Sequence, residues 1–233
     1  MALQSHNLKA IQKEYKPLFL LIIMTIPGKC SKCRNNAEIN SANQLYCRNC
    51  FLDVIDKRIK KSMKGKLEKG EKVLVLDEIT KKAFGRTVSI PVKPIFRNKS
   101  FFGKRSLQEL IAEKKFSDFL KKEKIAKALI PWTADMEASE LLENFFTLNR
   151  KISDNNYVKF FKDITEEELE EYAKILEADY CSETSGEAAG FAAEIENQYP
   201  GTIFSLAKSK EALDEILGKM LGKKQRNKKG KKK

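Results

Sequence analysis

Four cysteines within a short stretch constrain this chain more than any other feature of its sequence. Residues 30–50 read CSKCRNNAEINSANQLYCRNC, so Cys30 and Cys33 form one pair and Cys47 and Cys50 another, each with two residues between them. Two such knuckles bring four thiolates around one tetrahedral ion, and Zn²⁺ favours sulfur ligands at about 2.3 Å. The pattern predicts one structural zinc ion above a short polar hairpin, with an iron–sulfur cluster as the alternative.

The context of the cysteines argues against disulfides and against redox chemistry. Neither pair stands between a strand and a helix as in a thioredoxin-type motif. A four-thiolate site also suits the reducing cytosol, where disulfides seldom persist. We therefore predict a cytoplasmic protein whose cysteine module is a scaffold.

The first 27 residues are predicted to be a disordered leader, unless translation starts at Met24. Residues 18–24, LFLLIIM, superficially resemble a signal peptide. This run is too short to cross a bilayer, and no small-residue cleavage site follows it. We expect neither secretion nor a membrane span from this segment, and no membrane is the leading expectation for the chain's partners.

A basic helix is predicted directly after the cysteines. Within residues 51–66, apolar side chains recur at close to the helical period, and the other face is basic. Residues 28–66 carry a net charge of +7. The predicted RNA-binding side chains on this helix are Lys57, Arg58, Lys60, Lys61, Lys64 and Lys66.

Charge is segregated along the chain, which has a formal net charge of +13. Residues 218–233 contain nine basic residues and no acid, whereas residues 67–217 sum to −5. We predict that this tail is disordered and that Lys223, Lys224 and Arg226 contribute to RNA binding. A basic pole and tail around an acidic body favour a polyanionic partner, RNA first, with an anionic membrane surface or nucleolar targeting as alternatives.

The body, residues 67–217, alternates short apolar runs with helical patterns. EKVLVLDE predicts a buried strand, residues 86–96 an edge strand or loop because of Pro91 and Pro94, and KALIP a second buried strand. Capping boxes at Ser106 and Thr165 open helices, Asp135 is the predicted cap of another, and two more follow after residue 186. This alternation predicts an α/β fold with a mainly parallel sheet flanked by helices.

The loops of this body contain no recognisable catalytic apparatus. The strand VLVL is followed by DEITKKAFG, without a glycine-rich turn to hold a phosphate and with two carboxylates, Asp77 and Glu78, that would repel one. The chain's single histidine, His6, stands in the leader, so a histidine-based acid–base pair is excluded from the body. Cys181 is the only cysteine outside the module, and core packing is its more common role.

Taken in order, these segments resemble the PP-loop tRNA thiolation proteins, and most closely the family's non-catalytic eukaryotic branch. The module at residues 30–50, the basic helix and the strand after Gly70 follow the family's order. PWTADMEASELLENFF is similar to the family motif Gly-His-Asn-x-Asp-Asp-Glu-Ala, but has Trp132 and Met136 in place of the histidine and the second aspartate. FFKDITEEELEEYAKILEADY and YPGTIFSLAKSKEAL are similar to the two closing segments.

The resemblance also implies what is missing. Catalytic members carry a pyrophosphate loop, Ser-Gly-Gly-x-Asp-Ser, where this chain has DEITKK, and two sulfur-carrying cysteines. Nothing matches the first cysteine, and Thr184 aligns with the second, three residues after Cys181. The resemblance therefore implies a degenerate PP-loop domain of the adenine nucleotide alpha hydrolase-like class, with a zinc module at its N-terminus and no bound nucleotide.

The function implied is that of a pseudo-enzyme subunit in tRNA wobble-uridine 2-thiolation. Its expected partners are tRNA and a catalytic PP-loop subunit in a heterodimer, with a ubiquitin-related sulfur carrier as a further candidate. Two other hypotheses remain: a diverged ATP-dependent tRNA thiolase that uses Cys181, and a zinc-ribbon RNA-binding protein of ribosome assembly. The predicted domains are the leader (1–27), the module with its basic helix (28–66), the α/β domain (67–217) and the tail (218–233).

Overall fold

The computed structural model describes residues 28–103, 106–147, 156–182, 184, 186–210, 212–213 and 215–216. The chain divides into two compact units, Met1–Phe51 and Leu52–Lys233, with the boundary inside one helix. The leader and the basic tail, for which disorder is predicted, lie outside the described residues, as do Lys223, Lys224 and Arg226.

The first unit contains the predicted hairpin. Strands β1 (Ile39–Ser41) and β2 (Gln44–Tyr46) pair antiparallel, Ile39 opposite Tyr46. The two residues between them, Ala42 and Asn43, have φ of +48° and +61°. Such a two-residue turn with positive φ matches the twist of the flanking strands. Helix α2 (Arg48–Met63) begins two residues after β2, which confirms the predicted basic helix.

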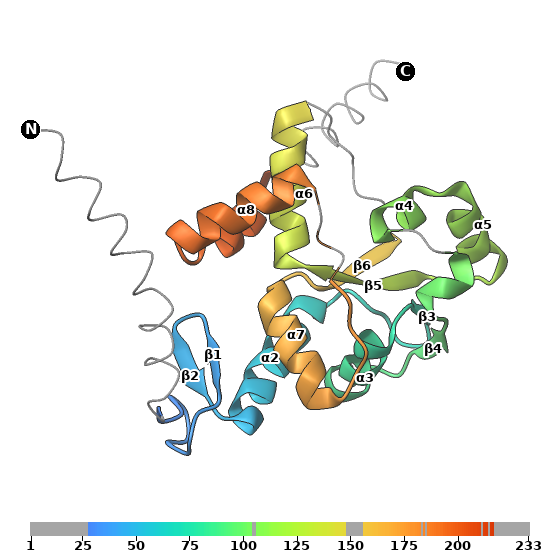
Figure 1. Ribbon diagram of the computed structural model, residues 1–233. Helices are drawn as coiled ribbons and strands as arrows, with labels where there is room; N and C mark the ends of the chain where they lie inside the picture. Colours follow the sequence, from blue (N-terminus) through green and yellow to red (C-terminus); the bar gives the residue numbers. More distant parts are fainter. Residues whose placement is uncertain are drawn as a thin grey trace, which may run out of the picture. The chain divides into compact units, whose positions relative to one another are not determined.

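The second unit is built on a four-stranded sheet in the order β4-β3-β5-β6 (Figure 1). The strands are β3 (Lys72–Val75), β4 (Lys93–Phe96), β5 (Lys127–Thr133) and β6 (Tyr157–Phe161), and every neighbouring pair is parallel. The predicted parallel α/β fold is confirmed. Pro94 lies in edge strand β4, where a missing N–H is tolerated.

Helices cover both faces of this sheet because alternate residues of its strands point to opposite sides. Helices α4 (Leu107–Ala112) and α5 (Lys114–Lys122) pack over one face, and α3 (Glu78–Thr87) and α7 (Glu166–Leu176) lie on the other (Figure 1). The core beneath α4 and α5 includes Leu74, Leu76, Leu107, Leu110, Phe116, Ala128, Ile130 and Trp132. Tyr172 and Leu169 of α7 are fully buried.

Both predicted capping boxes are present. The Ser106 hydroxyl accepts the N–H of Glu109, and the Glu109 carboxylate accepts the N–H of Ser106; Thr165 and Glu168 do the same at α7. The helix predicted over residues 106–125 is interrupted, however, because Glu113 takes an extended conformation with ψ of 129°. That break turns one amphipathic stretch into α4 and α5.

One predicted cap is wrong. Helix α6 (Ala134–Thr147) starts before Asp135, and the side chain that caps it is Thr133, whose hydroxyl accepts the N–H of Met136 at 3.3 Å. Asp135 instead accepts the N–H of Glu166 at 2.7 Å and so caps the neighbouring helix α7. The cap was misassigned because strand β5 runs directly into α6 without a loop.

The C-terminal part of the described chain packs on α6. Helix α8 (Glu187–Gln198) contacts α6, and residues 202–210 form a further helix whose Ile203 packs against Ala134 and Ala138. These two helices confirm the helical patterns predicted after residue 186. Within the described ranges, none of the helices combines the length and the apolar character that a bilayer crossing requires.

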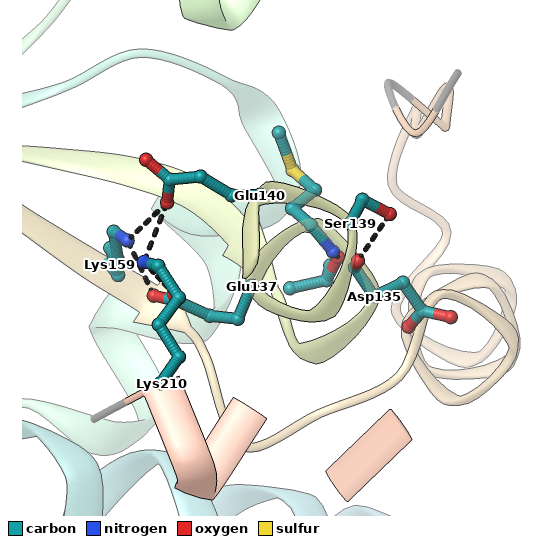
Figure 2. Close-up of polar contacts among 8 residues, drawn as sticks. Asp135, Glu137, Ser139, Glu140, Lys159 and Lys210 are labelled. Carbon is teal, nitrogen blue, oxygen red and sulfur yellow. Dashed lines mark hydrogen bonds and ion pairs between the residues drawn. The ribbon is translucent and has the colours of Figure 1, made fainter. Parts of the chain in front are cut away.

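A buried ion cluster fixes the last helix to the sheet (Figure 2). The Lys210 ammonium lies 2.5 Å from the Glu137 carboxylate and 2.6 Å from that of Glu140. Lys159 of β6 lies 2.6 Å and 3.3 Å from the same two carboxylates. Two lysines thus balance two glutamates, as burial of charge requires.

Candidate functional site

The four cysteines of the first unit form one cluster. Cys30 and Cys33 lie on a tight turn in which Cys30 N–H donates to the Asn35 carbonyl at 2.8 Å and Arg34 N–H to the Cys30 carbonyl at 2.9 Å. Cys47 follows strand β2, and Cys50 stands in the first turn of α2. All four sulfur atoms lie within 4.8 Å of one another, and all four are free thiols.

This geometry fits a single tetrahedral ion. Bonds of about 2.3 Å to zinc place sulfurs about 3.8 Å apart, and the Cys33 and Cys47 sulfurs are 3.5 Å apart. In a four-iron cluster each thiolate binds a different iron, which spreads the sulfurs further than one ion does. Contact with the Cys33 thiol raises the pKa of Cys50 to about 12, and a bound cation would offset the repulsion among four thiolates.

A second candidate site is a cleft at the carboxyl edge of the parallel sheet, where doubly wound folds bind ligands. The cleft has a volume of about 640 Å³. Its polar lining comes from the loop after β3, from the short helix η1 (Lys99–Phe102) and from the segment after α7. The charged lining residues are Asp77, Glu78, Lys99 and Asp179, and Cys181 also lines it.

The N-terminus of α3 at this cleft is occupied by the chain's own carboxylate. Asp77 is the N-cap, and its side chain accepts the N–H of Thr80 at 2.7 Å and the Thr80 hydroxyl at 2.8 Å. A helix N-terminus after a central strand is the position at which many α/β proteins bind a phosphate. Here that position already holds a negative charge, with Glu78 as the next residue.

A network of partly buried polar groups from the end of β5, from α7 and from the segment after α7 lies beside the cleft. The Glu166 carboxylate accepts the hydroxyls of Thr133 at 3.1 Å, Thr184 at 2.5 Å and Tyr180. The pKa of Asp135 is raised to about 6, mainly by burial and in addition by the negative charge of the Glu166 carboxylate. The hydrogen bond from the Glu166 backbone N–H acts in the opposite direction. The Thr184 hydroxyl is thus part of this hydrogen-bond network.

The family motif positions around β5 are apolar. Trp132 is 5% exposed and Met136 3% exposed, and both belong to the core beneath α4 and α5. These are the two positions that the resemblance aligns with a histidine and an aspartate of catalytic members, and here both side chains are buried. No histidine stands among the described residues, because the chain's single one is His6.

The predicted RNA-binding residues of α2 and its C-terminal extension differ in their availability. Lys57, Lys60, Lys61, Lys64 and Lys66 are exposed. Arg58 is half-buried, and its guanidinium lies 2.7 and 2.8 Å from the carboxylate oxygens of Glu168. Arg58 therefore ties α2 to α7, and the five lysines remain the available cations.

Comparison with solved structures finds a protein of similar fold. The structure is similar to that of the U34-tRNA thiolase NcsA from Methanococcus maripaludis with its [4Fe-4S] cluster, with a TM-score of 0.62 and 16% identity. The match covers 82% of this chain and 88% of the thiolase. At this identity the likeness establishes the fold alone. No family model matches the chain, and no curated protein does.

Sequence reasoning missed one strand of the sheet and the position of one residue that lines the cleft. It did not assign β6, although the run YVKFF alternates in burial as a strand does. It also gave Cys181 no location, and the structure brings this thiol to the cleft through the turn after α7, about a hundred residues from Asp77. The four-cysteine motif was found because its members are close in sequence.

Proposed function

We propose that this chain is a non-catalytic subunit of a tRNA wobble-uridine 2-thiolation complex, resembling cytoplasmic tRNA 2-thiolation protein 2. The observation that carries the proposal is the Asp77 carboxylate at the N-terminus of α3, in a fold similar to that of a U34-tRNA thiolase. A nucleotide phosphate at this position would meet Asp77 and Glu78 instead of free N–H groups. The fold is kept and the phosphate site is lost.

The sulfur-transfer apparatus is lost in parallel. Thr184 hydrogen-bonds to Glu166, and the two motif positions in β5 and α6 are buried in the core as Trp132 and Met136. One altered residue is compatible with a diverged enzyme. Loss of the phosphate loop, the motif and the paired cysteines together supports a pseudo-enzyme.

The features that this chain retains are those that would bind a metal ion and tRNA. The four cysteines would hold one zinc ion, which keeps the knuckles and the start of α2 in place. The exposed lysines of α2 and of residues 64–66, with the basic tail, would contact tRNA phosphates. A catalytic PP-loop subunit, served by a ubiquitin-related carrier, would supply adenylation and sulfur in a cytoplasmic complex. In this proposal residues 28–66 are the zinc module with its basic helix, and residues 67–217 are the degenerate PP-loop domain.

Equilibrium binding of ATP tests the carrying observation directly. The purified chain is expected not to bind ATP or pyrophosphate at millimolar concentration, whereas a PP-loop thiolase measured in parallel does. The double variant Asp77→Ser with Glu78→Gly removes both carboxylates and is a control for the electrostatic argument. Tight ATP binding by the unaltered chain would contradict the proposal.

One observation favours a second candidate, a diverged ATP-dependent thiolase. Cys181 is exposed and lines the cleft at the sheet edge, where a sulfur-carrying thiol would be needed. Its sulfur has only a weak contact, 3.7 Å from the Ser182 carbonyl, and the charged cleft residues beside it are mainly acidic. Persulfide formation at Cys181 would support the diverged enzyme. It would be detected by mass spectrometry after incubation with a persulfide donor, which transfers its outer sulfur to the Cys181 thiolate and leaves as a thiol.

A further inference from the structure

Three exposed phenylalanines lie on the two neighbouring helices α6 and α8. Phe145 is 57%, Phe146 64% and Phe191 45% exposed. The rings of Phe146 and Phe191 lie 6.1 Å apart between centroids, on two helices that pack together. We call these three residues the aromatic patch. A single exposed aromatic side chain is ordinary, but several at one place indicate a contact surface.

All charged residues of the two helices beneath the patch are acidic. Helices α6 and α8 together carry seven carboxylates and no lysine or arginine. Four of the seven have partners: Glu137 and Glu140 bind lysines, and Asp135 and Glu196 accept backbone N–H groups. The remaining three are exposed and pair with no cation in the described part of the chain: Glu143, Glu187 and Glu194.

These three glutamates border the phenylalanines. Glu143 precedes Phe146 by three residues, and Glu187 and Glu194 stand four before and three after Phe191. Residues three or four apart on a helix are surface neighbours. The aromatic patch therefore has an acidic rim with unused acceptor capacity.

The charge of the rim selects the occupant. RNA and a second copy of the same acidic face would both be repelled. Lysine-rich polypeptide is attracted, since each ammonium can pair with a rim glutamate and lie over a phenylalanine ring. The occupant that fits is a basic segment.

The chain contains such a segment close by. Residues 218–233 carry nine basic residues and no acid, with Met220 and Leu221 as apolar members. The helix that leads to this tail is fixed to α6 through Lys210, which contacts Glu140. Phe146 stands six residues further along α6, a rise of about 9 Å, while a sixteen-residue chain can extend over about 50 Å. Tethering gives the tail a millimolar effective concentration at the patch.

We propose that the basic tail, residues 218–233, docks on the aromatic patch of its own chain. Its lysines pair with Glu143, Glu187 and Glu194, and its lysine stems and ammonium groups cover Phe146 and Phe191. Docking neutralises the exposed acids of α6 and α8 and shields the aromatic rings from water.

Carbodiimide cross-linking of the full chain tests this docking, because it joins a lysine to a carboxylate only in direct contact. The expected products are links between tail lysines and the three rim glutamates, mapped by mass spectrometry. Mixing ¹⁴N- and ¹⁵N-labelled protein distinguishes links within a chain from links between chains. The double variant Phe146→Ala with Phe191→Ala is expected to lower the yield about tenfold at moderate salt.

The matched control is Phe101→Ala, which removes another exposed phenylalanine, 62% exposed, far along the chain on η1. This variant is expected to leave the yield unchanged, with circular dichroism verifying the fold of each protein. Four outcomes would each overturn the proposal: links that join the tail mainly to Asp77 or Glu78, links from Lys151 in place of the tail, links between chains, or equal yields in the double variant and in Phe101→Ala.

A tRNA arm separates this inference from the proposed function. Added tRNA is expected to lower the cross-link yield, because its phosphates compete for the same lysines. This arm alone rests on the proposed tRNA-binding role. Intact rim links that tRNA does not reduce would support docking and contradict RNA binding by the tail.

Discussion

Replacing Lys210 with methionine should destabilise the second unit by about 2–3 kcal/mol. The Lys210 side chain is 8% exposed, and the Glu137 and Glu140 side chains that it contacts are 11% and 20% exposed. Burial alone would lower the pKa of Lys210, but the two glutamates raise it, so the ammonium is charged in the folded protein. Burial lowers the pKa of Lys159, which makes it the weaker counterion.

The magnitude follows from what the variant leaves behind. Two glutamates then share Lys159 alone, and one buried negative charge is uncompensated. Breaking a buried ion pair costs about 3–5 kcal/mol, and the remaining contacts to Lys159 bring the expected loss below that range. Methionine preserves most of the apolar volume, so little of the loss comes from a cavity.

Urea denaturation followed by tryptophan fluorescence measures this loss. Trp132 is the chain's only tryptophan, is buried in the core of the second unit and lies 4.5 Å from the Lys159 ammonium. With a slope of about 2 kcal/mol per molar urea, the midpoint should fall by about 1–1.5 M. The control is Lys208→Met, an exposed lysine on the same helix. Equal midpoints for the two variants would refute the argument that the buried cluster stabilises the fold.

Three further predictions concern titration, metal and RNA. The pKa of Asp135 in the folded protein is about 6, above its ordinary value of 3.8, so the group favours the folded state below pH 4 and loses that contribution as pH rises to 6. Asp135→Asn should therefore raise the free energy of unfolding at pH 8 by about 1–2 kcal/mol and flatten its dependence on pH. An unchanged pH profile of stability would contradict this. Metal analysis should find one zinc and no iron per chain. Cys30→Ser should lose the metal and unfold the module, because structural zinc contributes about 10–16 kcal/mol to folding. An unchanged melting profile of the Cys30→Ser protein would exclude a structural metal. Binding of tRNA should weaken with a log–log salt slope of about −4 for five phosphate contacts. This slope should shrink on charge reversal of the exposed lysines on and just after α2, which are Lys57, Lys60, Lys61 and Lys64. Charge reversal of three exposed lysines on and just after α5, Lys121, Lys122 and Lys124, should leave the slope unchanged.

Features that depend on neighbouring residues were predictable from the sequence. The capping boxes at Ser106 and Thr165 are present because each involves residues three apart, whose hydrogen bonds form in any helix start. The cysteine cluster was predictable for a similar reason, since a hairpin of fixed length brings its two pairs together. Pro94 correctly placed its segment at the sheet edge, because proline cannot donate to a central ladder.

Features that depend on distant contacts were not predictable. Asp135 looked like the cap of α6, but the strand continues to Thr133 and leaves the aspartate to accept the N–H of Glu166 in another helix. The same holds for Arg58, which charge alone assigned to RNA and which a contact with Glu168 holds at α7. In both cases the side-chain partner is more than thirty residues away, beyond the range of any local pattern.

Reconstitution tests the proposal that this chain supports thiolation without performing it. The purified chain is combined with a catalytic PP-loop homologue, tRNA, ATP and a sulfur donor, each component is omitted in turn, and 2-thiouridine is measured. We expect no 2-thiouridine from this chain without the homologue and stimulation when both are present. The Cys181→Ser variant should support activity within a few-fold of wild type. Formation of 2-thiouridine by this chain alone, abolished in a folded Cys181→Ser protein, would contradict the account and identify the chain as an enzyme.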